Sequence, residues 1–162
     1  MIAPSHRAWG RFFMLNIVYA IVGAAFMVGM GVFAAIKGDR TERFGAGAYL
    51  LAWFASIVLQ GNSGFRGMPI GLFLIDIALL ITFVALAWRS ARSWPVWACG
   101  AQLITVMCHI MILTGQKVPL GSLITVMNLT GYLIIGCIIV GTFWAWQDRK
   151  AAARSGGIGR KS

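Results

Sequence analysis

The sequence predicts an all-α integral membrane protein that forms a bundle of five transmembrane helices. Of its 162 residues, 59% are hydrophobic and only 11% are charged, and the mean hydropathy is +0.81. A soluble domain usually carries about 25% charged residues. The apolar residues also form continuous runs, and the length of these runs is close to that of a membrane-spanning helix, about 20 residues. These observations exclude a soluble enzyme, a disordered chain and a small disulfide-bonded scaffold.

Five apolar segments are expected to form the helices, which makes residues 1–146 one transmembrane domain. The segments cover residues 12–36, 44–60, 68–88, 95–114 and 120–146. The second segment is short, because it extends only about 25 Å at about 1.5 Å per residue. If it does not cross the membrane, the bundle has four spans instead of five. The short connections make consecutive helices antiparallel neighbours.

Basic residues are divided unequally between the two ends of this predicted bundle. With five spans, ten of the 14 Lys and Arg residues lie on the side of the C-terminus and four on the side of the N-terminus. Basic loops stay in the cytoplasm, which puts the N-terminus outside and the C-terminus inside a bacterial inner membrane. With four spans the split is nine to five, and the N-terminus is inside. Tryptophans mark the predicted inner boundary as an interfacial belt would, namely Trp88, Trp94, Trp97, Trp144 and Trp146.

Residues 147–162 differ abruptly in composition from the rest of the chain. This segment has several basic residues, three glycines and almost no apolar residues, which predicts a flexible basic tail. A basic segment next to a membrane helix is attracted to anionic lipid head groups. The residues expected to contact the lipid surface are Arg149, Lys150, Arg154, Arg160 and Lys161.

Asp76 and His109 are the two ionisable residues that carry a hypothesis about chemistry. Asp76 is the only acidic residue inside an apolar segment, and His109 is the only histidine inside one. Placing a charged Asp at the centre of a membrane helix costs about 2.5–3.5 kcal/mol, so such residues mark ion paths and proton relays. The alternative for Asp76 is a protonated acid that bonds a neighbouring helix. The alternative for His109 is an interhelical hydrogen bond without any role in transfer.

Counting residues from the turns places several polar side chains at one depth. Asp76 precedes and His109 follows the turn near Ala91 by similar numbers of residues, so they lie within about 5 Å of the same level. Asn128 follows the next turn and Asn16 begins the first segment on that same side, while Gln102 shares a helix face with His109. We expect a polar pocket in the outer half of the bilayer, lined by Asp76, His109, Asn128, Gln102 and Asn16.

No motif in the sequence indicates a metal or a bound cofactor. The three cysteines lie within apolar segments and are expected to be buried thiols, and no zinc spacing is present. A haem with two histidine ligands needs two buried imidazoles, and His6 is expected outside the membrane. We therefore expect no metal and no cofactor in this chain alone, although a partner subunit could complete a haem or quinone site.

The last 80 residues carry a pattern of tryptophan, glutamine and histidine. Trp94-Pro-Val-Trp97 is followed by Gln102 and His109, and Gly-Thr-Phe-Trp occupies 141–144. This pattern resembles small uncharacterised polytopic bacterial membrane proteins. The resemblance implies a membrane location and no particular activity.

Three functions remain open from the sequence. The first is a non-enzymatic accessory subunit of the inner membrane that packs with other membrane proteins or with a second copy, because no loop is large enough to fold alone. The second is a small proton-coupled carrier that uses Asp76 and His109. The third is a subunit that binds a quinone or a lipid head group in the outer pocket. No catalytic residues and no nucleic-acid partner are expected.

Overall fold

The computed structural model describes the backbone of residues 6–62 and 68–158, and the side chains of residues 21–60 and 70–154. The described chain is all-α and has five helices. These are α1 (His6–Lys37), α2 (Arg40–Asn62), α3 (Met68–Arg89), α4 (Trp94–Leu113) and α5 (Leu120–Ile158). The predicted all-α fold is thereby confirmed, with each helix overlapping one predicted segment.

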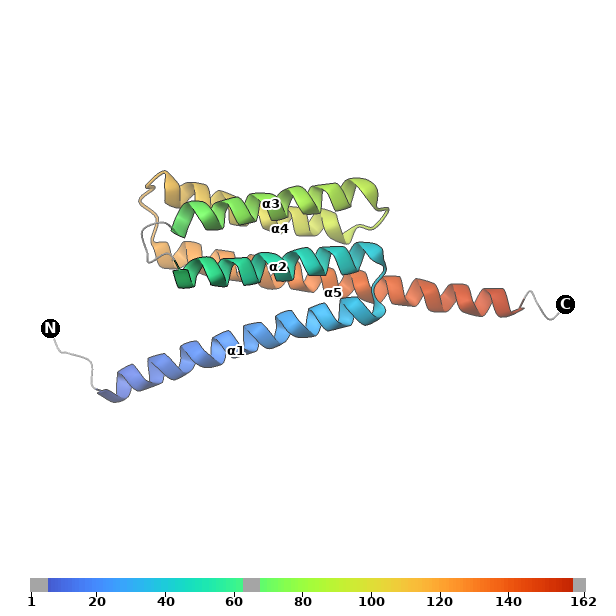
Figure 1. Ribbon diagram of the computed structural model, residues 1–162, viewed down its shortest axis with the longest axis horizontal. Coiled ribbons are helices and arrows are strands. Elements are labelled where there is room, and N and C mark those ends of the chain that lie inside the picture. Colours follow the sequence, from blue (N-terminus) through green and yellow to red (C-terminus); the bar gives the residue numbers. More distant parts are fainter. Residues whose placement is uncertain (1–5, 63–67, 159–162) are drawn as a thin grey trace.

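The helices run up and down along one axis (Figure 1). The α1–α2 and α3–α4 connections lie at one end of the bundle, which we call the α1–α2 end, and α5 extends beyond it. The C-terminal end of α2, the start of α3 and the α4–α5 connection lie at the opposite end, which we call the α2–α3 end. Among the described residues, α1 packs only on α2 and α5, and it diverges from α2 toward its own N-terminus. The N-terminal part of α1 is therefore the part of the bundle that packs least closely on neighbouring helices.

Three helices are long and apolar enough to cross a membrane: Ile70–Arg89, Trp94–Leu113 and Leu120–Arg154. Within α1 the described apolar stretch, Ile21–Lys37, is shorter. In the part of the chain whose side chains are described, α2 is not among these candidates. Large apolar side chains nevertheless cover the outside of the whole bundle, for example Leu51 on α2 and Ile81 on α3. Such a surface is suited to lipid rather than water.

The start of α2 is set by a capping interaction. The backbone N–H of Asp39 donates to Glu42 Oε2 at 2.9 Å, and Glu42 is the third helical residue. This is the reciprocal half of a capping box, which satisfies a donor that the helix itself leaves free. It lets α2 begin at Arg40, four residues earlier than the apolar segment, and reach a length of 23 residues.

Helix α5 continues to Ile158, well past the predicted end of its apolar segment at Trp146. Residues 147–158 are thus helical where the sequence predicted a flexible tail. Ala151, Ala152 and Ala153 have the highest intrinsic helix propensity, and Lys and Arg rank close behind. The remaining tail residues, including Arg160 and Lys161, lie outside the described residues.

The core is centred on Trp94, the first residue of α4. Its side chain is 2% exposed and meets the ring of Phe83 edge-on, with centroids 6.4 Å apart. A Cβ atom added at Gly45 on α2 or at Gly141 on α5 would overlap the indole. The two glycines therefore let three helices converge on a single large side chain.

Candidate functional site

Asp76 on α3 contacts two polar side chains of α4, Gln102 and His109. Gln102 Nε2 donates to Asp76 Oδ1 at 2.8 Å and to the Asp76 backbone carbonyl at 3.2 Å. His109 Nδ1 lies 3.3 Å from Asp76 Oδ2. Both carboxylate oxygens thus have a partner, which is the condition under which an acidic side chain is tolerated among apolar helices.

His109 is itself buried, with 4% of its surface exposed. Its Nδ1 also lies 3.3 Å from the carbonyl of Thr105, one turn earlier in α4, and its ring packs against Phe73. A proton on Nδ1 can therefore be shared between the carboxylate and this carbonyl. The pair holds one shared proton as an ionised Asp beside a protonated His or as two neutral groups, and it has released that proton when an ionised Asp lies beside a neutral His.

A pair of hydroxyl groups joins α4 to α5 one turn before His109. Thr105 Oγ1 and Thr130 Oγ1 are 2.8 Å apart, and Thr130 donates to the Met127 carbonyl at 2.9 Å. Either hydroxyl can be the donor, because Thr105 also reaches the Ala101 carbonyl of its own helix at 3.5 Å. This contact holds the rotation of α4 about its axis, and with it the orientation of the helix face that carries both Gln102 and His109.

A cavity of about 190 Å³ adjoins the Asp76–His109 pair. Helix α2 supplies Tyr49, Ser56 and Gln60 to its wall, and α5 supplies Asn128. Gln60 and Asn128 are exposed, whereas Tyr49 is half-buried and donates to the Gly131 carbonyl at 3.1 Å. The cavity therefore runs from two exposed amides near the α2–α3 end to the Asp76–His109 pair.

The structure brings together four of the five residues predicted for a polar pocket. Asp76, Gln102, His109 and Asn128 all line the same cavity. The side chain of Asn16, the fifth, lies outside the described residues. The α2 side chains of the wall were not predicted, because the sequence does not show which face of this short apolar segment points inward. A polar spacing of four residues between Ser56 and Gln60 is the only signal that could have indicated them.

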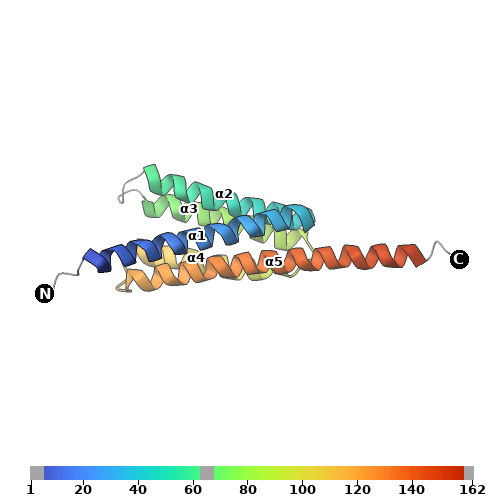
Figure 2. The same ribbon diagram turned by 90° about the horizontal axis from the view of Figure 1, so that it is seen from below.

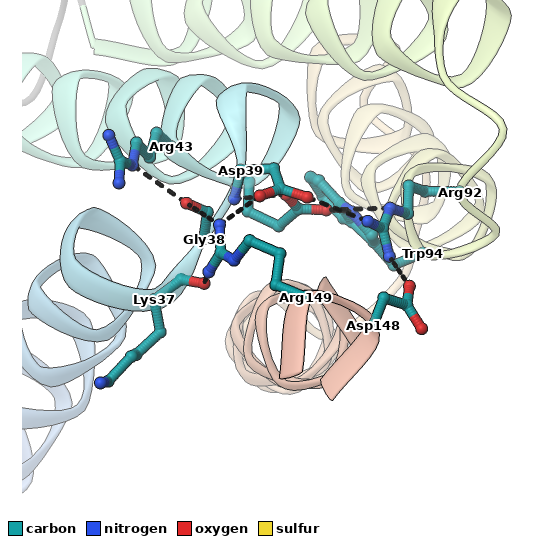
Figure 3. Close-up of polar contacts among 9 residues, drawn as sticks. Lys37, Gly38, Asp39, Arg43, Arg92, Trp94, Asp148 and Arg149 are labelled. Carbon is teal, nitrogen blue, oxygen red and sulfur yellow. Dashed lines mark hydrogen bonds and ion pairs between the residues drawn. The ribbon is translucent and has the colours of Figure 1, made fainter. Parts of the chain in front are cut away.

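A second polar cluster occupies the α1–α2 end of the bundle (Figure 3). It contains three of the chain's four acidic residues, which are Asp39, Glu42 and Asp148. Arg92, in the α3–α4 connection, lies 3.0 Å from Asp39 Oδ2 and 2.8 Å from Asp148 Oδ2. Arg149 on α5 pairs with Asp39 and donates to the backbone carbonyls of the α1–α2 turn. The cluster ties both connections of this end to α5.

Glu42 is the innermost member of this cluster. Its side chain is fully buried, with Trp94 Nε1 donating to Glu42 Oε1 at 3.0 Å and Arg92 Nε at 3.9 Å from that oxygen. The buried indole and the buried carboxylate satisfy each other, and together they close the bundle at this end. Polar access to the core is therefore more direct from the α2–α3 end.

The basic residues predicted to contact lipid differ in their surroundings. Arg149 is engaged in the cluster just described rather than directed only at lipid. The Lys150 ammonium lies over the Trp146 ring, 3.8 Å from its centroid, and Lys37 approaches the same ring at 5.4 Å. Arg154 is exposed on the last described turn of side chains. Lys150 and Arg154 are therefore the described tail residues that remain available to a lipid head group.

Among the described residues, no group of three or more His, Cys, Asp and Glu side chains is arranged to hold a metal ion. The three cysteines are free thiols. No family model, no curated protein and no solved structure matches this chain. The functional argument therefore depends on the Asp76–His109 cavity itself.

We predict that Asp76 and His109 are energetically coupled. Asp76→Asn and His109→Gln, alone and together, should lower the free energy of unfolding in mixed micelles non-additively, with a coupling above about 0.5 kcal/mol. The control cycle pairs Asp76→Asn with Thr125→Val, because the Thr125 hydroxyl bonds only the Gly121 carbonyl of its own helix. Additivity in the first cycle would show that the pair shares a level without interacting.

Proposed function

We propose that this chain is a five-span protein of the bacterial cytoplasmic membrane that binds a small molecule in its Asp76–His109 cavity and couples binding to a proton. The N-terminus lies outside and the C-terminus in the cytoplasm, so the cavity opens toward the outer face. This is the second of the three functions that the sequence left open. No catalytic step is part of the proposal, and no cofactor is required for it.

The length of α2 supports a fifth span. Its 23 residues extend about 34 Å at about 1.5 Å per residue, which exceeds the hydrocarbon thickness of about 30 Å. The up-and-down order of the helices places both ends of α2 level with those of α3 (Figure 1). Glu42 and Arg43 near its start make polar contacts at the α1–α2 end, so they do not need to enter hydrocarbon.

The distribution of basic residues supports the orientation. The α1–α2 end carries the basic residues of both connections and of the α5 extension, including Lys37, Arg92 and Arg149. By the positive-inside rule this end is cytoplasmic. Lys150 and Arg154 would then lie where anionic lipids of the inner leaflet can reach them.

The observation that carries the function is the contact between His109 Nδ1 and Asp76 Oδ2 at the end of a polar cavity. A purely structural polar contact between helices does not need a cavity beside it. Here two ionisable groups share a proton within reach of an exposed entrance formed by Gln60 and Asn128. An intramembrane acidic residue with a histidine partner and water access is suited to proton exchange.

The accessory-subunit function remains a prediction from the sequence. The apolar outer surface of the bundle is equally suited to lipid and to another membrane protein, so it favours neither. Co-purification in mild detergent would test it, because a stable complex with another subunit or with a second copy is the expected result of that function.

The proposed entrance is tested by chemical labelling. In a chain whose three native cysteines are replaced by alanine, Asn128→Cys should react with a membrane-impermeant maleimide added to spheroplasts. The reaction requires a thiolate, which forms in water and not in hydrocarbon. Leu129→Cys is the matched control, because Leu129 is the next residue of α5 and is 69% exposed on the lipid-facing surface. Equal labelling of the two positions, or reaction of Asn128→Cys only from the cytoplasmic face, would contradict the proposal.

A further inference from the structure

The Asp76–His109 cavity does not end at α2. A larger cavity of about 510 Å³ lies between α1, α2 and α5, and the two share Tyr49, Ser56, Gln60 and Asn128 in their walls. Small-molecule sites in proteins commonly measure about 300–1,000 Å³. The smaller cavity alone is below this range, whereas the larger one falls within it. The two are therefore best regarded as chambers of one site.

The two chambers differ in chemistry. The smaller chamber is lined by Asp76, Gln102 and His109 in addition to the shared polar residues. The larger chamber adds apolar and aromatic side chains, among them Met27, Trp53 and Ile57. A polar chamber that continues into an apolar one is suited to a molecule with a polar head and a hydrocarbon chain.

The charges of the site favour a neutral head group over a charged one. Among the described residues that line either chamber, Asp76 is the only acidic residue, His109 is the only histidine, and none is Lys or Arg. A phosphate head would meet at most one cation, a protonated His109, whose charge Asp76 balances at 3.3 Å. A cationic head would meet a carboxylate whose two oxygens already have partners in Gln102 and His109. The head group that fits is neutral.

The hydrogen-bonding groups indicate what that head carries. The amides of Gln60 and Asn128 have no partner among the described residues, and neither does Nε2 of His109. Each amide can donate to a carbonyl oxygen. Nε2 donates when the ring is protonated, and it accepts from a hydroxyl when the ring is neutral with its proton on Nδ1. A head with carbonyl oxygens in one form and hydroxyl groups in the other would suit both states of the histidine.

We propose that the two chambers bind a quinone, with its ring beside Asp76 and His109 and its hydrocarbon chain between α1, α2 and α5. This inference rests on the proposed function and names the ligand class of the same site. It concerns binding alone and assigns no electron transfer to the chain. The protonation state of the Asp76–His109 pair then depends on whether the bound quinone ring carries carbonyl or hydroxyl groups.

The test is binding of decylubiquinone to the full-length protein in nanodiscs, measured by tryptophan fluorescence. Trp53 is the only described tryptophan that lines either chamber, and a quinone quenches a nearby indole. Saturable quenching is expected, and Trp53→Phe should abolish most of it. Trp97→Phe is the matched control, because Trp97 is 71% exposed and lines neither chamber. Absence of saturable quenching, or equal effects of the two substitutions, would overturn the proposal.

Two further variants separate the chambers. His109→Gln removes a partner of the ring, and Ala24→Phe fills the apolar chamber at a position on α1. Each should weaken binding about tenfold or more, as loss of a buried hydrogen-bond partner or of pocket space does. If Ala24→Phe does not fold, Ile57→Trp fills the same chamber from α2. Unchanged affinity in a folded chamber-filling variant would rule out the assigned position of the chain.

Decyl phosphate, which has the same chain and an anionic head, should not displace the quinone. Displacement at equal concentration would show that the site recognises the chain or an anion, and would overturn the quinone assignment. Failure here is distinguishable from failure of the proposed function. If Asn128→Cys is labelled from outside and Asp76 is coupled to His109, but decylubiquinone does not bind, only the ligand class is wrong.

Discussion

Glu42→Ala should destabilise the protein by about 3–5 kcal/mol, the loss seen when one partner of a buried ionic contact is removed. The substitution leaves the Trp94 indole N–H buried without an acceptor and removes the carboxylate beside Arg92. It also removes the side chain that caps the first turn of α2 through the Asp39 N–H. The free energy of unfolding in mixed micelles measures this loss. Glu42→Gln, which retains an oxygen acceptor for Trp94, should lose less.

Asp148→Ala is the matched control for this experiment. Asp148 bonds the same arginine, with Arg92 Nη1 at 2.8 Å, but its side chain is 69% exposed. Exposed ion pairs contribute about 0–1 kcal/mol because water screens the charges and the side chains lose entropy when they pair. If Asp148→Ala were as costly as Glu42→Ala, burial would not be the reason for the importance of Glu42.

The helices could be predicted from the sequence because hydrocarbon imposes a length on every apolar span. The ends of α2 and α5 could not be predicted in the same way. Helix α2 begins at Arg40 because of a capping contact between Asp39 and Glu42, which the sequence shows only as two acids three residues apart. Helix α5 continues through residues that are polar but have high helix propensity. Hydropathy marks where a helix meets lipid, not where it ends.

The sequence predicted the depth of the candidate-site residues along the bundle. It did not predict which way each helix is rotated about its axis. Counting from the turns placed Asp76 and His109 at one level, and the structure places them in contact. The contribution of Tyr49 and Gln60 depends on how α2 is rotated about its own axis, and the apolar composition of that helix leaves this rotation undefined. The cluster at the α1–α2 end depends on contacts between residues up to 112 positions apart, such as that between Arg149 and Lys37. Charges that the sequence indicates only as topology signals are therefore also the contacts that hold this end together.

The second large effect is expected at Trp94, where packing and the buried hydrogen bond coincide. Trp94→Ala should cost about 3–5 kcal/mol, as removal of a buried aromatic side chain does. The indole fills the space above Gly45 and Gly141, so its loss leaves a cavity between α2, α4 and α5 that two glycines cannot fill. Helix association in lipid depends on such packing more than on hydrophobic burial, so the effect should persist in a bilayer.

Two further variants divide this effect into its parts. Trp94→Phe keeps an aromatic ring against Phe83 but removes the donor to Glu42, so its loss should fall between that of Trp94→Ala and zero. Combined with Glu42→Leu, Trp94→Phe should lose little more than Glu42→Leu alone, because neither polar group is then left buried without its partner. Trp97→Ala, one turn later on the same helix and 71% exposed, should change stability only slightly. Comparable losses at Trp94 and Trp97 would mean that interfacial anchoring, rather than packing between the three helices, explains the role of Trp94.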